Sequence, residues 1–197
     1  MDLTWRLLDF AKTGGWVMIP VAVTSLLMWT LIGERLMTYR RFGRRDIALQ
    51  DAVHAVQGSP VNSFGSGLRA TLVRNFVRVR TGEAELDRRI LRECAMKMEP
   101  VIERNLAVIA VLGSIAPLLG LLGTVSGMIT TFTVIAELGT GNARPLAGGI
   151  SEALVATQAG LMVAIPGLFV SVALRRRATK LSHRLDQTTL LLQHQLR

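Results

Sequence analysis

The sequence contains a single cysteine, Cys94, which excludes an internal disulfide framework and a zinc site built on cysteines. Charged residues are scarce as well, at 19% of the 197 residues, and they are unbalanced, with 23 Lys and Arg against 14 Asp and Glu. Hydrophobic residues make up 50% of the chain. This content excludes an intrinsically disordered protein, because disordered chains have low hydrophobicity.

The sequence also lacks the short motifs of common catalytic and nucleotide-binding sites. It has no P-loop, no GxGxxG pattern after a strand, no nucleophile elbow and no HExxH pattern. The three histidines, His54, His183 and His194, are scattered along the chain and are interpreted as solvated surface residues. We therefore expect neither an enzyme nor a bound metal or organic cofactor.

Hydrophobic residues gather in three long runs, at positions 13–33, 106–136 and 145–174. The first two hold no charged residue over 21 and 31 positions, and the third holds one, Glu152, in 30. Because about 20 apolar residues of helix cross a bilayer core, the runs predict three transmembrane helices, at 16–33, 106–136 and 148–174. The expected fold is an all-α integral membrane protein with long helices extending into a cytoplasmic helical region. The first run is expected to be a membrane span and not a cleaved signal peptide. The residues before it carry two acidic as well as two basic residues, and no small-x-small cleavage pattern follows.

The distribution of Lys and Arg predicts the orientation of these helices. Residues 1–15 hold two, residues 34–105 hold fourteen, residues 137–147 hold one and residues 175–197 hold six. By the positive-inside rule, segments 1–15 and 137–147 are periplasmic, and segments 34–105 and 175–197 are cytoplasmic. The arginines at 40–45 and 175–177 are then expected to lie against anionic headgroups of membrane lipids, so no nucleic-acid partner is expected.

The segment at 34–105 shows three helical patterns. Apolar spacing predicts helices near 46–56, 68–79 and 85–105, with breaks at 58–60 and 81–83. The last pattern points directly into the second apolar run. The two can therefore form one continuous helix of about 50 residues, with a kink at Pro100.

Glu152 is the informative residue of the three runs. A carboxylate inside a bilayer is costly, so an intramembrane acid is by default a candidate functional group with a polar surrounding. The alternative is a boundary carboxylate near the outer interface, favoured by the dipole at the helix N-terminus. The first interpretation is preferred, and it makes Glu152 a protonatable group that faces a polar lumen.

Small and hydroxyl residues surround this position in the second and third runs. Pro117, Gly120, Gly123, Gly127, Ala156 and Gly160 are expected to let the helices pack closely and to line the lumen. Thr124 and Thr157 are candidate lumen hydroxyls, although Ser and Thr can also bond to the backbone of their own helix. Strict helical geometry places Ala156, rather than Thr157, next to Glu152.

Two long motifs carry a resemblance to a known family. They are APLLGLLGTVSGM at 116–128 and GISEALVAT at 149–157, followed by Gly160-Leu161 and Ala164-Ile165-Pro166. In this order, and with three spans, they resemble the ExbB/TolQ/MotA proton-channel family, and most closely its ExbB branch. Ser126 departs from the pattern, since many members have Trp there, and the choice between the Exb and Tol systems stays open.

The resemblance implies a homopentamer in the bacterial inner membrane that surrounds the single span of an ExbD-like or TolR-like partner. It also implies that Glu152, Thr124 and Thr157 form the proton pathway together with an aspartate of that partner. Proton flow would then drive a TonB-like or TolA-like energy transducer. Protons are the expected coupling ion, and sodium is the less favoured one, kept open by Gln158. A non-conducting scaffold remains an alternative.

Overall fold

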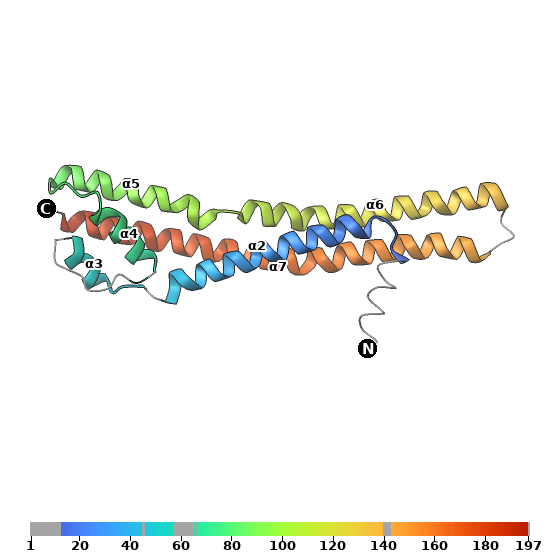
Figure 1. Cartoon of the computed structure of the whole chain (residues 1–197), viewed down its shortest axis with the longest axis horizontal. Coiled ribbons are helices and arrows are strands. Elements are labelled where there is room, and N and C mark those ends of the chain that lie inside the picture. Colours follow the sequence, from blue (N-terminus) through green and yellow to red (C-terminus); the bar gives the residue numbers. More distant parts are fainter. Residues whose placement is uncertain (1–12, 45, 57–64, 66, 140–142, 197) are drawn as a thin grey trace. The chain divides into compact units, whose positions relative to one another are not determined.

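The computed structural model describes residues 13–44, 46–56, 65, 67–139 and 143–196, and these residues form helices and no strands. Six helices follow one another in this part of the chain (Figure 1). They are α2 (Met18–Arg44), α3 (Leu49–Val56), α4 (Leu68–Val77), α5 (Ala84–Glu103), α6 (Leu106–Leu138) and α7 (Ala143–Gln195). The predicted all-α fold is therefore confirmed.

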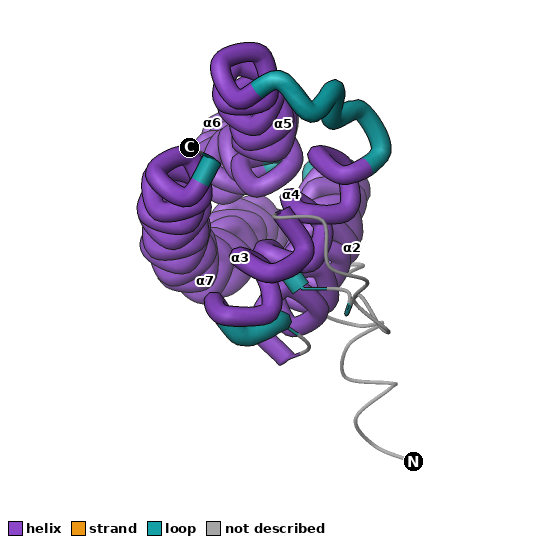
Figure 2. Tube along the Cα trace, turned by 90° about the vertical axis from the view of Figure 1, so that its left-hand side faces the viewer, coloured by secondary structure: helices purple, strands orange, loops and turns teal. Residues whose placement is uncertain are grey.

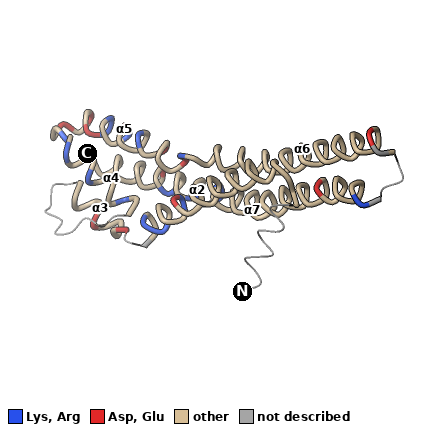
Figure 3. The backbone as a smooth tube through the Cα atoms, turned by 45° about the vertical axis from the view of Figure 1, so that its right-hand side comes forward, with Lys and Arg blue, Asp and Glu red and all other residues tan. Residues whose placement is uncertain are grey.

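The helices divide into two compact units. The first unit contains the described residues up to Ile32 together with Ala107–Ser171, and the second contains Gly33–Leu106 and the described residues from Val172 onward. The charged residues are concentrated on the second half of α2, on α4 and α5, and on the second half of α7, whereas α6 carries only Glu137 (Figure 3). The first unit is thus the apolar one.

In the first unit, the first half of α2 packs with α6 and the first half of α7. Val17, Val21 and Ala159 form a buried cluster, with Leu119 and Val163 packed against it. Many large apolar side chains of the same unit point outward, among them Leu118, Ile129, Phe132, Met162 and Phe169. An apolar exterior of this kind suits a lipid or subunit environment rather than water.

In the second unit, α3 packs on α4 and α4 on α5 (Figure 2). The core of this unit is apolar and fully enclosed, with Leu72, Phe76, Leu91 and Leu192 at 0% exposure. The predicted helices at 46–56, 68–79 and 85–105 correspond to α3, α4 and α5. The predicted break at 58–60 lies outside the described residues.

Two carboxylates fix the turns that precede α4 and α5. Asp46 Oδ1 accepts hydrogen bonds from the backbone N–H of Arg69 at 2.8 Å and of Ala70 at 3.4 Å, which caps the start of α4. Asp87, which is 3% exposed, accepts bonds from the backbone N–H groups of Thr81 at 2.7 Å and Gly82 at 3.1 Å. Because side-chain oxygens satisfy the free N–H groups at these positions, the chain can turn at 81–83 and restart as a helix.

The continuous helix expected across 85–136 is wrong, because α5 ends at Glu103 and α6 begins at Leu106. Asn105 between them has a φ of 61°, the left-handed conformation that ends helices and that Asn tolerates. Pro100 remains inside α5. The interruption therefore spans two residues, of which Asn105 alone is left-handed, and it is not a proline kink.

Three side chains of α2 hold this interruption. Arg35, which is 2% exposed, donates from Nη1 to the carbonyl oxygen of Val101 at 3.0 Å. The Tyr39 hydroxyl donates to the carbonyl oxygen of Ile102 at 2.8 Å, and Asn105 Nδ2 donates to Glu34 Oε2 at 3.2 Å. These carbonyls lie in the last turn of α5, where the helix itself supplies no donors. The side chains of α2 replace the missing N–H groups.

Replacement of Tyr39 by phenylalanine is expected to destabilise the protein by about 1 kcal/mol, because the buried Ile102 carbonyl loses its donor. Chemical unfolding in detergent, followed by circular dichroism, measures the change. Thr38→Val is the control, since the Thr38 hydroxyl bonds only within α2, to the carbonyl of Glu34 at 2.9 Å. Equal stability of the Tyr39 and Thr38 variants would contradict this assignment.

Candidate functional site

Glu152 lies well inside α7, nine residues after the helix begins at Ala143. Nine residues span about 13 Å, whereas the helix dipole acts mainly within the first turn. Stabilisation by the helix N-terminus, the basis of the boundary interpretation, therefore does not apply at this depth. The side chain is half-buried, and it is the single charged residue between Arg144 and Arg175.

The Glu152 carboxylate lies directly against Gly15, in the short segment before α2. A Cβ added to Gly15 would stand 2.8 Å from Glu152 Cδ and would overlap Oε1. Gly15 also has a φ of 70°, a conformation that other residues rarely adopt. Position 15 therefore requires glycine for two reasons. Its backbone conformation disfavours other residues, and the Glu152 carboxylate occupies the space of a side chain.

The residue after Gly15 ties the same segment to α6. Trp16 Nε1 donates to Ser126 Oγ at 3.2 Å, and the Trp16 side chain is otherwise largely exposed. Sequence reasoning missed this arrangement, since nothing in the local pattern indicated that residues near the chain start would cover Glu152. Ser126, the departure from the family pattern, supplies the acceptor.

The two candidate hydroxyls occupy different environments. Thr157 Oγ1 donates to the carbonyl of Gly120 in α6 at 3.3 Å and to that of Ala153 in its own helix at 3.1 Å. Thr124 Oγ1 donates to the carbonyl of Leu121 in its own helix at 2.6 Å. Both hydroxyls thus bond to backbone carbonyls rather than to Glu152. Thr130, Thr131 and Thr133 likewise bond within α6, as the alternative interpretation expects.

Glycines of α6 form a tight seam with the small residues of α7. A Cβ on Gly127 would stand 2.7 Å from the Gly149 carbonyl oxygen and 2.8 Å from the Ala153 nitrogen. At Gly123 a Cβ would overlap the Cβ of Ala156, and at Gly120 it would stand 3.2 Å from the Ala156 carbonyl oxygen. The backbones of the two helices therefore approach each other along this seam.

The seam continues toward the C-terminal side of α7 and the N-terminal side of α6, since the two helices are antiparallel. A Cβ on Gly160 would stand 2.7 Å from the Ala116 carbonyl oxygen and 3.0 Å from Gly120 Cα. Pro117, the remaining small-face candidate, is half-buried within α6. The seam buries Ala153 and Ala156 but leaves Glu152 at its edge, beside Gly15.

The chemistry available at this place is that of one carboxylate, a few hydroxyls and backbone carbonyls. Among the described residues, no group of three or more His, Cys, Asp or Glu is placed to hold a metal ion. Cys94 lies half-buried in α5, as expected for a packing residue. A carboxylate and hydroxyls between apolar helices can take up and release a proton, and they supply no nucleophile–base pair.

Three helical stretches of the described chain are long and apolar enough to cross a membrane, within Met18–Gly43, Ala84–Glu137 and Arg144–Gln195. The protein is thus a multi-pass helical membrane protein. The model of the MotA/TolQ/ExbB proton channel family matches residues 61–187. The chain belongs to this family, whose members are channel or transport subunits and not enzymes.

Curated relatives agree with this assignment. The chain is 31% identical to the biopolymer transport protein ExbB of Neisseria gonorrhoeae, over 89% of the chain and 90% of that protein. It is 34% identical to ExbB of Pseudomonas putida over 78% of the chain, and 30% identical to ExbB of Salmonella typhimurium, also over 78%. The matches cover 51% of the Pseudomonas protein and 69% of the Salmonella protein, so the chain spans about half the length of the former.

Proposed function

We propose that this chain is an ExbB-like subunit of an inner-membrane motor driven by the proton motive force. With an ExbD-like single-span partner, it energises a TonB-like protein for nutrient uptake across the outer membrane. The observation that carries the proposal is the place of Glu152, a lone carboxylate nine residues inside an otherwise uncharged helix. Such a group is costly in a membrane and is retained where it carries ions or protons.

In this proposal Glu152 accepts and releases the proton, and Thr157 and Thr124 line its path with hydroxyls. Thr157 supports the assignment because it already bridges the two helices through the Gly120 carbonyl. One proton that crosses 100 mV supplies about 2.3 kcal/mol, so a few protons suffice to move a partner helix against its contacts. We propose protons as the coupling ion, in keeping with the family description, and sodium as the less favoured ion.

We propose a homopentamer around the partner's span, with segments 1–15 and 137–147 in the periplasm and segments 34–105 and 175–197 in the cytoplasm. The outward apolar residues of the first unit support burial against lipid and other subunits. The excess of Lys and Arg in the second unit supports its cytoplasmic side. The relatives reported above carry the name ExbB, which favours the Exb system over a TolQ-like role.

The test is proton flux into proteoliposomes that hold this chain together with its single-span partner. We expect flux in the complex and background flux with either protein alone, because the partner supplies the second carboxylate of the path. Native mass spectrometry of the same preparation counts the subunits. Background flux in an intact complex, together with full support of TonB-dependent growth, would favour the scaffold alternative and overturn the proposal.

A further inference from the structure

The second unit contains a groove lined by four cations. Arg40 of α2 and Arg177, Lys180 and Arg184 of α7 line it, together with Tyr39, Gly43 and Leu181, around a volume of about 240 Å³. The four cationic side chains are exposed at its rim, whereas Tyr39 and Leu181 are buried at its floor, with exposures of 5% and 8%. An anionic ligand would thus meet positive charge above an apolar base.

The lining residues of α7 follow helical spacing. Arg177, Lys180, Leu181 and Arg184 stand at i, i+3, i+4 and i+7, so they share one face of the helix. The neighbouring arginines 175 and 176 are exposed as well but do not line the groove. Only some of the basic residues in this stretch of α7 therefore line the groove.

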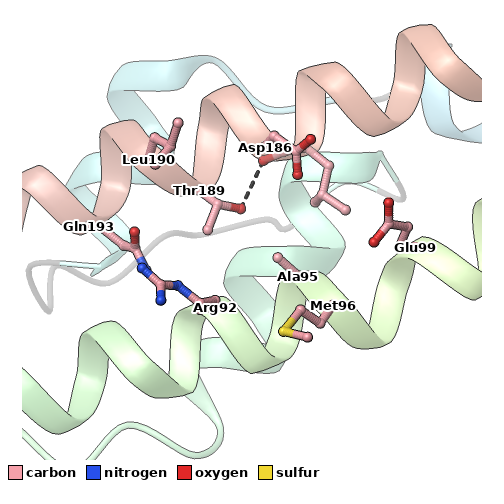
Figure 4. Close-up of a pocket in the computed structure, with 9 residues that line it drawn as sticks. Arg92, Ala95, Met96, Glu99, Asp186, Thr189, Leu190 and Gln193 are labelled. Carbon is pink, nitrogen blue, oxygen red and sulfur yellow. Dashed lines mark hydrogen bonds between the residues drawn. The ribbon is translucent and has the colours of Figure 1, made fainter.

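No carboxylate is among the residues that line the groove, and no ion pair in the described part of the chain involves its four cations. A second groove of this unit differs in this respect. It lies between α5 and α7, measures about 260 Å³ and is lined by Glu99 and Asp186 as well as by Arg92, which lies at the other end near Gln193 (Figure 4). The groove of mixed charge does not favour an anionic ligand, whereas the groove lined by four cations and no carboxylate does.

The depth of the groove along α7 fits a headgroup layer. The apolar run ends at Leu174, and Arg177, Lys180 and Arg184 follow it by three, six and ten residues, about 5, 9 and 15 Å along the helix. A headgroup layer is roughly 5–8 Å thick on each side of the bilayer core. Lys and Arg side chains also extend along the helix toward the interface. Lipid phosphates therefore lie within reach of the end of the groove that Arg177 and Lys180 line.

We propose that this groove is a binding site for the phosphate headgroup of an anionic phospholipid, assembled by α2 and α7 together. The cations hold the phosphate by charge-assisted hydrogen bonds, and Tyr39 and Leu181 contact the glycerol and first methylenes. A site of this kind ties α2 to α7 whenever the lipid is present. It is independent of proton conduction and extends beyond the proposed function.

The test is native mass spectrometry of the full-length protein, titrated with phosphatidylglycerol or with phosphatidylcholine. We expect retained phosphatidylglycerol on the wild type and little phosphatidylcholine. The double substitution Arg177→Gln with Lys180→Gln should weaken phosphatidylglycerol retention roughly tenfold or more. The matched control, Arg175→Gln with Arg176→Gln, removes the same charge from the same helix outside the groove and should weaken retention severalfold less than the groove pair does.

A second pair of variants tests whether α2 contributes to lipid binding. Arg40→Gln should weaken retention more than Arg41→Gln, which removes the exposed neighbour outside the groove. Equal losses in groove and control variants would show a diffuse charge effect and overturn the site. Displacement of the lipid by millimolar inorganic phosphate would show a site for soluble anions and overturn the lipid assignment. Circular dichroism of each variant verifies that the helices are intact.

Discussion

Replacement of Glu152 by glutamine is expected to reduce proton flux through the reconstituted complex to the level of protein-free liposomes. Glutamine has nearly the shape of glutamate and fits the space against Gly15, but it does not bind or release a proton in the physiological range. The helix packing around the position should therefore survive while the transfer step is lost. The fluorescence of a pH-sensitive dye inside the liposomes, followed at a fixed membrane potential, measures the proton flux.

Glu137→Gln is the matched control for this experiment. Glu137 lies near the end of α6, is exposed, and undergoes the same chemical change. Its variant should conduct like the wild type. Glu152→Asp adds a second arm, since it keeps a carboxylate but withdraws it by one methylene, and partial flux is expected. Full flux in an intact Glu152→Gln complex would remove Glu152 from the mechanism.

Replacement of Gly160 or Gly127 by alanine is expected to destabilise the first unit by about 1–3 kcal/mol, because each new methyl group enters space held by the facing helix. At Gly160 the obstructing atom is the Ala116 carbonyl oxygen, at 2.7 Å, and at Gly127 it is the Gly149 carbonyl oxygen, also at 2.7 Å. Backbone atoms cannot move aside as a flexible side chain can. The helices must therefore separate, and assembly in native mass spectrometry should decline along with stability.

Gly148→Ala is the control on the same helix as Gly160. Among the described residues, no atom of a neighbouring element lies within 4 Å of a Cβ at this position. Alanine is the better helix former by about 1 kcal/mol, so this variant should be unchanged or slightly stabilised. If Gly160→Ala and Gly148→Ala unfold at the same denaturant concentration, the seam between α6 and α7 does not stabilise the fold.

The helices of this protein could be predicted well from local patterns. Long uncharged runs allow only helices in lipid, since each backbone group must then bond within its own segment. The bounds of α3, α4 and α5 followed from apolar spacing and from the break at 81–83. The interruption at Asn105 was missed, because the proline at position 100 was the stronger local signal and Asn is compatible with a helix interior.

The candidate site was foreseen in part. Glu152 stood out because it is a lone charge in an apolar run. A carboxylate at such a place indicates a group that can carry a proton. Its neighbour Gly15 lies 137 positions earlier in the chain, and no local pattern connects the two. The same holds for Trp16 and Ser126, whose hydrogen bond joins residues 110 positions apart.

The sequence by itself determined that this is a three-span helical membrane protein of the MotA/TolQ/ExbB family with one carboxylate in its third apolar run. These properties depend on composition, spacing and motif order along the chain. The tertiary structure decided which residues meet: Gly15 with Glu152, Tyr39 and Arg35 with the end of α5, and Arg40 with the basic face of α7. Contacts between distant segments depend on helix packing and on where a helix stops, and a single left-handed residue such as Asn105 changes both.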